Sequence, residues 1–253
     1  MLICYSSTTD QSKVDVFIIT VPTPVNRNNI PDLKPLKDAS SLVGSILKKN
    51  DLVIYESTVF PGATQNICVP ILANTSGLEY NKEFFCGYSP ERINPGDPSH
   101  ELTKIKKIVS ASNDYSLNIV SKIYKKIIKK GIVKASSIET AEAAKVIENT
   151  QRDVNIALFN EFSIIFDKLN LKSSEIFDLA ATKWNFVKYQ PGLVGGHCIP
   201  VDPYYLAYKS KKVGYTPKVI LSGRETNEKM SIILYNKIIN ICNRKKINLK
   251  KLN

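Results

Sequence analysis

The sequence has 253 residues, of which 43% are hydrophobic and 23% charged, so it can bury the core of one large domain or two small ones. Most of its 35 basic residues are lysines scattered along the chain, so the net charge of +12 does not indicate a nucleic-acid or membrane-surface protein. No apolar run approaches the ~20 residues that cross a bilayer, and no secretory signal is recognisable. Five widely spaced cysteines indicate a reduced, cytoplasmic protein.

Strand and helix signals alternate through the first half of the chain. Apolar runs predict strands at residues 14–20, 52–56, 84–88, 106–110 and 132–134, the first of them a buried parallel strand. Helical stretches separate them at residues 36–48, from Pro61-Gly62 onward, and at 115–129. This alternation predicts an α/β fold with a Rossmann-like parallel sheet.

Three polar residues follow the first three strands: Thr23, Thr58 and Glu91. Ligands of open parallel sheets lie outside the carboxyl ends of the strands, so these side chains are candidates for a binding site. Each signal is weak by itself, because a threonine in this position usually caps a helix and Ser89-Pro90-Glu91 usually forms a turn.

The second half of the chain is predicted to be all helical. Residues 138–169 contain no Gly or Pro and repeat apolar residues at helical spacing, which predicts one spine helix roughly 45 Å long. Such a helix joins two domains or packs against a second subunit. Further helices are expected at residues 173–181, 203–212 and 217–240.

The long helix carries a polar stripe. Lys145, Asn149 and Arg152 are spaced so that all three project from one face, and alanines at positions 141, 143 and 144 keep that face narrow. An arbitrary triplet of this kind is more often a solvated surface than a site.

Residues 191–203 contain a thiol in an unusual setting. Cys198 directly follows Gly195-Gly196-His197 and precedes Asp202 by four residues. Glycines allow a ligand to approach the backbone, and a thiolate is a nucleophile. The ordinary alternative is a turn with a buried cysteine. A metal site is disfavoured, because adjacent His and Cys chelate one ion poorly and no second cluster lies near.

This segment, with Lys183-Trp184-Asn185-Phe186 before it and Tyr204-Tyr205-Leu206 after it, resembles the active-site segment of the UDP-glucose/GDP-mannose dehydrogenase family. It is most similar to the branch that oxidises UDP-N-acetylhexosamines. Residues 141–153 resemble the substrate-binding helix of the same family. The resemblance implies a partial NAD-binding domain at residues 1–135, a helical central domain for substrate and dimerisation at 136–240, and the start of a carboxyl-terminal nucleotide-sugar domain at 241–253.

The resemblance also assigns roles to residues. Cys198 is the nucleophile, Lys145 and Asn149 hold the reacting hydroxyl and the oxyanion, Asp202 is the acid after the nucleophile, and Glu91 acts through water in thioester hydrolysis. Substrate contacts fall on Arg92, Ile93, Arg152, Gly195 and Gly196. Thr23 and Thr58 lie on the cofactor side, and Thr58 is also a catalytic candidate.

The implied reaction is the NAD-dependent oxidation of the C6 hydroxyl of a UDP-N-acetylhexosamine to the uronic acid through a cysteine thioester, in surface polysaccharide biosynthesis. Pro95 stands where UDP-glucose enzymes commonly carry a second acid, which argues against UDP-glucose. We expect a homodimer and no metal, nucleic-acid or membrane partner.

One departure from the family limits this interpretation. The sequence has no G-x-G-x-x-G motif and no acidic residue placed to bind the adenosine ribose, so the resemblance covers only the middle of the family and predicts a fragment truncated at both ends. The alternative is a catalytically inactive fragment or an assembly partner of a split dehydrogenase. A stand-alone cysteine hydrolase is weaker, because neither His100 nor His197 is placed as a separate base.

Overall fold

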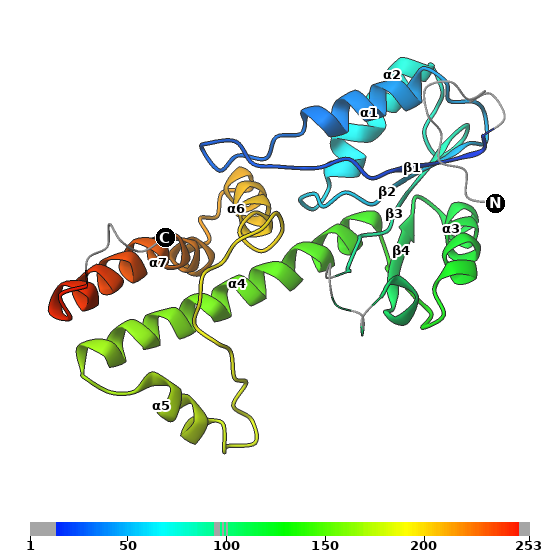
Figure 1. Ribbon diagram of the computed structural model, residues 1–253. Coiled ribbons are helices and arrows are strands. Elements are labelled where there is room, and N and C mark those ends of the chain that lie inside the picture. Colours follow the sequence, from blue (N-terminus) through cyan, green and yellow to red (C-terminus); the bar gives the residue numbers. More distant parts are fainter. Residues whose placement is uncertain (1–13, 94–96, 98, 100, 248–253) are drawn as a thin grey trace. The chain divides into compact units, whose positions relative to one another are not determined.

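The computed structural model describes residues 14–93, 97, 99 and 101–247 (Figure 1). The chain divides into two compact units. The first comprises Met1–Ile147 with Tyr204–Lys209, and the second comprises Glu148–Pro203 with Ser210–Asn253. The two are described separately below.

The first unit is built on a five-stranded sheet with the order β1-β2-β3-β4-β5. Its strands lie at the predicted places: Val16–Ile19, Leu52–Tyr55, Phe85–Tyr88, Lys107–Ala111 and Ile132–Lys134. Strands β1, β2 and β3 are parallel to one another, as are β4 and β5. The carboxyl ends of β1, β2 and β3 therefore meet at one edge of the sheet.

One pair departs from the predicted parallel arrangement, because β4 runs antiparallel to β3. A parallel return needs a crossover connection, usually a helix. Between these strands the described residues form one short 3-10 turn, η4 (Leu102–Lys104), so the chain returns in the opposite direction.

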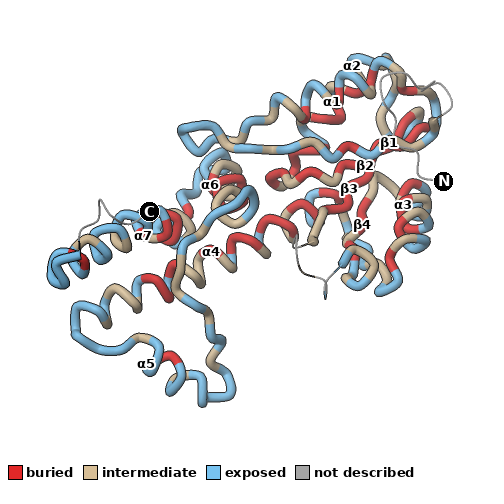
Figure 2. Tube along the Cα trace, in the orientation of Figure 1, coloured by how far each residue is buried: buried red, intermediate tan, exposed pale blue. Residues whose placement is uncertain are grey.

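Helices cover both faces of this sheet. On β2, Leu52 and Ile54 belong to the same core cluster as Val120 of α3 (Asp114–Ile127). Neighbouring residues of a strand face opposite sides. Tyr55 accordingly contacts Ser40 of α1 (Lys34–Gly44), with 2.8 Å between the two hydroxyl oxygens. Buried residues are concentrated on β2 and β3, as Figure 2 shows.

Strand β1 is less buried than its apolar sequence predicts. Ile18 is 38% exposed, and of the four strand residues only Ile19 is buried. Strand β1 stands at an edge of the sheet formed by the described residues, with β2 as its neighbour. In the described part of the chain, β1 therefore lacks a second neighbouring strand at one edge, and the face that carries Ile18 is less closely packed than that of a central strand.

The helix predicted to start at Pro61-Gly62 has two parts. A π-helix, η2 (Thr64–Cys68), precedes α2 (Val69–Ser76), and the amide of Val69 donates to the carbonyl of Thr64. Pro70 has no N–H and its ring clashes with the carbonyl four residues earlier, so a regular α-helical turn is blocked here.

The second unit is helical, as expected. Helix α4 (Ile138–Lys168) is 31 residues long, about 46 Å, and its residues from 148 onward belong to this unit. The others are α5 (Ser173–Ala180), α6 (Asp202–Lys212) and α7 (Lys218–Arg244). Phe159 of α4 packs on Phe177 of α5, with 4.9 Å between ring centroids. Gly223 allows α7 to lie directly on α4, because a Cβ there would already be 3.4 Å from Val154.

Candidate active site

The residues predicted from the sequence fall into both units. The first unit contains Thr23, Thr58, Glu91, Arg92, Ile93 and Lys145, and the second contains Asn149, Arg152, Gly195, Gly196, Cys198 and Asp202. Pro95 and His100 lie outside the described residues.

Thr23 and Thr58 follow β1 and β2, whose carboxyl ends meet at one edge of the sheet, and both side chains are half-buried. Both turns pack on α6. The buried Tyr205 donates its hydroxyl to the carbonyl of Thr23 at 2.8 Å. The ring of Phe60, two residues after Thr58, lies 5.3 Å from that of Tyr208. Helix α6 therefore supports both turns at the edge where parallel sheets bind ligands.

The turn after Thr58 is also held by a carboxylate of α4 that sequence reasoning missed. Glu142 is fully buried, and its two oxygens accept from the amides of Gly62 at 2.5 Å and Thr64 at 2.9 Å. We name these three residues the Glu142 network. Burial raises the pKa of Glu142 to about 7, although both amide hydrogen bonds lower it. An isolated acid among small residues, as in Ala141-Glu142-Ala143, was the available signal.

Glu91 follows β3 after Ser89 and Pro90, and its side chain bends back on its own backbone. Its Oε1 accepts from the amides of Arg92 at 2.6 Å and Ile93 at 2.7 Å, and its Oε2 lies 3.7 Å from the amine of Lys107. The side chain is 43% exposed, so water reaches this carboxylate. The guanidinium of Arg92, predicted to contact substrate, donates to the carbonyl of Lys106 at 3.0 Å.

Lys107 is a buried cation beside Glu91. Its side chain is 1% exposed, and its amine lies 3.3 Å from Glu56 Oε1. Tyr124 donates its hydroxyl to the same oxygen. Burial and the nearby Glu56 carboxylate raise the pKa of Tyr124, so its phenol keeps the proton that it donates. The sequence held no signal that separated Lys107 from the other lysines.

The polar stripe of α4 is not a solvated surface at its first two positions. Lys145 is 8% exposed and Asn149 is 5% exposed, while Arg152 is half-buried. Small neighbours on the helix allow other elements to cover these side chains. Side chains that cost this much desolvation are retained where they have partners or a function.

Cys198 is a free and exposed thiol, so the alternative of a buried structural cysteine is wrong. Its carbonyl accepts from the amides of Val201 at 3.1 Å and Asp202 at 2.9 Å, in a tight turn that opens α6. The carboxylate of Asp202, which is 3% exposed, accepts from the Asn149 amide at 2.6 Å. The structure thus brings Asn149, Asp202 and the cysteine turn together.

The two glycines before Cys198 differ. Gly196 has a φ of +87°, in the left-handed region, whereas Gly195 does not. A Cβ on either residue would meet no atom within 4 Å. The backbone before the thiol therefore has open space where a Cβ would stand at both positions.

The described part of the chain holds no group of three or more His, Cys, Asp or Glu side chains suited to a metal ion. None of its helices is long and apolar enough to cross a membrane.

Comparison with known proteins assigns the chain to a family. Residues 4–128 match the model of the UDP-glucose/GDP-mannose dehydrogenase family NAD binding domain, and residues 139–229 match that of its central domain. The chain belongs to the UDP-glucose/GDP-mannose dehydrogenase family.

Relatives within this family are similar over most of the chain. The UDP-N-acetyl-D-glucosamine 6-dehydrogenase of Pseudomonas aeruginosa is 54% identical over 230 residues, which cover 91% of this chain and 54% of the relative. Protein CapL of Staphylococcus aureus is 53% identical, and the match covers 55% of that relative. The solved UDP-D-ManNAc dehydrogenase of Pyrococcus horikoshii superposes with a TM-score of 0.85 at 33% identity, over 94% of this chain and 57% of that one. The chain spans about half the length of these relatives.

Members of this family bind NAD, and the chain carries part of such a site. Thr23 and Thr58 place two half-buried hydroxyl groups at the carboxyl edge of the parallel strands, where a dinucleotide binds. The amides of Gly62 and Thr64 are engaged by Glu142. The glycine-rich turn that holds a pyrophosphate is not among these 253 residues. The residues present therefore fit one side of NAD.

Proposed function

We propose that this chain supplies the reacting groups for the NAD-dependent oxidation of the C6 hydroxyl of a UDP-N-acetylhexosamine to the uronic acid, in polysaccharide biosynthesis. The observation that carries the proposal is the exposed Cys198 thiol on a turn whose Asp202 is bonded to the buried Asn149. The 54% identity to a UDP-N-acetyl-D-glucosamine 6-dehydrogenase supports the same substrate class.

The first oxidation turns the alcohol into an aldehyde. NAD, when bound, accepts a hydride from C6 in each of the two oxidations. The amine of Lys145 takes the proton of the C6 hydroxyl, as a general base. Lys145 is 8% exposed on α4, so the amine is shielded from bulk water.

The second oxidation depends on Cys198. Its thiolate adds to the aldehyde carbon to form a thiohemiacetal, and loss of the second hydride gives a thioester. Negative charge develops on the former carbonyl oxygen when the thiolate adds. Asn149 uses one N–H for Asp202 and has a second N–H to donate to that oxygen.

Hydrolysis completes the reaction. Glu91, which is partly exposed, takes a proton from a water molecule that attacks the thioester, and the carbon–sulfur bond breaks to release the acid and the Cys198 thiol. The sum is one alcohol, one water and two hydride acceptors converted into one acid, two reduced acceptors and two protons.

A second copy of the chain fits the exposed apolar residues of the helical unit. Leu158 and Ile165 of α4, and Leu169 directly after it, are each more than 40% exposed. Large exposed apolar patches are typical of protein interfaces. We propose a homodimer through α4. Sedimentation of the chain as a monomer at high concentration would contradict it.

A second candidate is an assembly partner that does not turn over, which the exposed apolar residues of the helical unit favour. The completed chain separates the two proposals. NAD reduction with a nucleotide sugar supports the enzyme, whereas a stable dimer that reduces no NAD supports the assembly partner.

An assay of NAD reduction tests the main proposal. The chain is completed with the flanking segments of its P. aeruginosa relative and is given UDP-N-acetylglucosamine, UDP-N-acetylgalactosamine or UDP-glucose. We expect a UDP-N-acetylhexosamine to be preferred. Cys198→Ser should bind the nucleotide sugar but not turn over, because a hydroxyl is a much poorer nucleophile than a thiolate.

The matched control is Cys242→Ser, which changes a buried cysteine of α7. It should keep its activity. A preference for UDP-glucose, or full activity of Cys198→Ser, would contradict the proposed function.

A further inference from the structure

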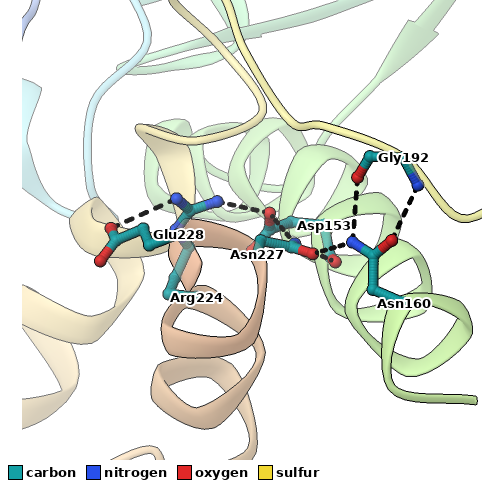
Figure 3. Close-up of polar contacts among 6 residues, drawn as sticks. All are labelled: Asp153, Asn160, Gly192, Arg224, Asn227 and Glu228. Carbon is teal, nitrogen blue, oxygen red and sulfur yellow. Dashed lines mark hydrogen bonds and ion pairs between the residues drawn. The ribbon is translucent and has the colours of Figure 1, made fainter. Parts of the chain in front are cut away.

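The cysteine segment is joined to α4 at its upstream end by a buried amide. Asn160 is fully buried, and its Oδ1 accepts from the amide of Gly192 at 2.7 Å. Its Nδ2 donates to the carbonyl of Gly192 at 3.0 Å. One side chain thus bonds both peptide groups of a single residue, six positions before Cys198 (Figure 3).

Asn160 is itself held by α7. Its second N–H donates to Asn227 Oδ1 at 2.8 Å, and Asn227 Nδ2 donates to both Oδ1 and the carbonyl of Asp153. Arg224 donates to the same carboxylate oxygen at 2.6 Å and contacts Glu228. We name these six residues the Asn160 network: Asp153, Asn160, Gly192, Arg224, Asn227 and Glu228.

The network fixes which way each amide points. Asp153 Oδ1 receives two hydrogen bonds, so Asn227 must turn its NH₂ group toward it and its oxygen toward Asn160. Asn160 must then direct one N–H at Asn227 and the other at the Gly192 carbonyl, which leaves its oxygen for the Gly192 amide. The carboxylate of Asp153 therefore sets the orientation of the Asn160 amide, which bonds the cysteine segment at Gly192.

The downstream end of the segment is bonded to α4 as well, through Asp202 and Asn149. Asn149 and Asn160 are eleven residues apart on one helix, which is about 16 Å. Between the two attachments lie Gly195, Gly196 and the thiol, and both glycine Cα atoms face open space. The segment between Gly192 and Asp202 is thus attached to α4 at both ends, and Gly195 and Gly196 within it have no close packing.

We propose that Asn160 is a positioning residue for Cys198. It fixes the backbone at Gly192, and the attached Asp153, Asn227 and Arg224 keep its amide in the required orientation. The mechanical part stands on the contacts alone, while its consequence for turnover rests on the proposed function of Cys198. Loss of Asn160 frees the upstream end and spreads the thiol over more positions.

Hydrogen exchange of the 253-residue chain tests the mechanical part. In Asn160→Ala we expect the amides of residues 192–198 to exchange at least about fivefold faster, the factor that one net hydrogen bond contributes. The matched control is Asn155→Ala on the same helix, whose amide bonds the nearby Gln151 carbonyl. It should leave exchange in this segment unchanged.

Asp153→Asn is the second variant, for the case that Asn160→Ala does not fold. It keeps the shape of the side chain but adds an N–H group. The side-chain amides of Asn227 and Asn160 can then both flip. We expect the hydrogen-exchange rates of the backbone amides of residues 192–198 to lie between the rates in the wild type and in Asn160→Ala. A residue that only supported helix packing would lower the melting temperature without changing exchange in this segment. Unchanged exchange in a folded variant overturns the proposal.

Kinetics in the completed enzyme test the consequence. Asn160→Ala should lower kcat about 10- to 100-fold, the cost of misplacing a reacting group by about 1 Å, while KM for the nucleotide sugar changes little. A rise in KM with unchanged kcat overturns it. Failure of the proposed function gives a different result, namely turnover by Cys198→Ser, and leaves the exchange measurement interpretable.

Discussion

Helix α4 holds a turn of each unit, and it uses different chemistry in the two places. In the first unit, the carboxylate of Glu142 accepts from two amides of the turn after Thr58. In the second, the neutral amide of Asn160 both accepts from and donates to Gly192. A carboxylate binds only donors and can take up a proton, whereas an amide pairs with both peptide groups and does not titrate.

This difference predicts which part of the molecule responds to pH. The Glu142 network contains a buried acid with a pKa of about 7, so its strength changes near neutral pH. Asn160, which bonds the cysteine segment, has no proton to gain or lose. The turn after Thr58 in the first unit should therefore respond to pH more strongly than the cysteine segment in the second unit.

The largest effect on this comparison is expected from removing the buried cation of the first unit. Lys107→Met leaves Glu56 without its cationic partner and removes the cation beside Glu91. Breaking one side of a buried pair costs about 3–5 kcal/mol. Chemical denaturation should show a loss in this range. The control Lys106→Met, next in sequence and exposed, should lose little. An equal loss in both variants would contradict the role of Lys107.

Glu142→Gln tests the charged side of the comparison. The folded-state pKa of Glu142, about 7, lies above the ordinary value of 4.5, so the folded protein binds this proton more tightly. The resulting stabilisation is complete below pH 4.5 and is lost as pH rises through 7. We expect the free energy of unfolding of the wild type, relative to Glu142→Gln, to fall by on the order of 2–3 kcal/mol across this window. Parallel pH curves would be the contrary result.

Asn160→Ala tests the neutral side. Removing a buried amide with three hydrogen bonds should destabilise the chain by about 1–3 kcal/mol, because Asn227 and Gly192 lose partners. The loss should vary less between pH 5 and pH 8 than the effect of Glu142→Gln, because Asn160 itself does not titrate and pH reaches its network only through Asp153, whose pKa burial raises. Thermal or urea unfolding at the two pH values checks it. A loss that varies with pH as much as the effect of Glu142→Gln would remove the distinction between the two networks.

The smallest effect is expected in the span between the two attachments. Gly196→Ala places a side chain at a φ of +87°, which costs about 1–2 kcal/mol. Gly195→Ala is the matched control, because a Cβ there meets nothing within 4 Å and the backbone is not left-handed. It should change the free energy of unfolding by less than about 0.5 kcal/mol. Equal effects of the two substitutions would contradict the backbone described for this turn.

Local patterns were enough to place the strands and helices. Apolar runs predicted the five strands of the described sheet, and the Gly-free and Pro-free stretch predicted α4. The antiparallel return of β4 was missed, because strand direction depends on the connection and not on the strand itself. The π-helix before Pro70 was also missed, since a proline near a helix start is usually compatible with a regular first turn.

The sequence revealed candidate site residues where they belong to a recognisable motif. It did not reveal the residues that hold them in place. Cys198, Asp202 and Asn149 belong to recognisable segments, and the structure brings them together. Glu142, Lys107 and Asn160 hold backbone or other side chains across long sequence separations. Such contacts depend on three-dimensional packing, so a single sequence gives no periodicity that reveals them.

Mass spectrometry of Cys198 tests the central claim most directly. A completed enzyme carrying Glu91→Gln is mixed with NAD and UDP-N-acetylglucosamine, quenched in acid and digested. Slow hydrolysis should let the thioester accumulate, so the peptide containing Cys198 should carry the mass of the uronyl nucleotide, and the adduct should disappear with hydroxylamine. NAD reduction without an adduct on Cys198, or an adduct on another residue, would contradict the account.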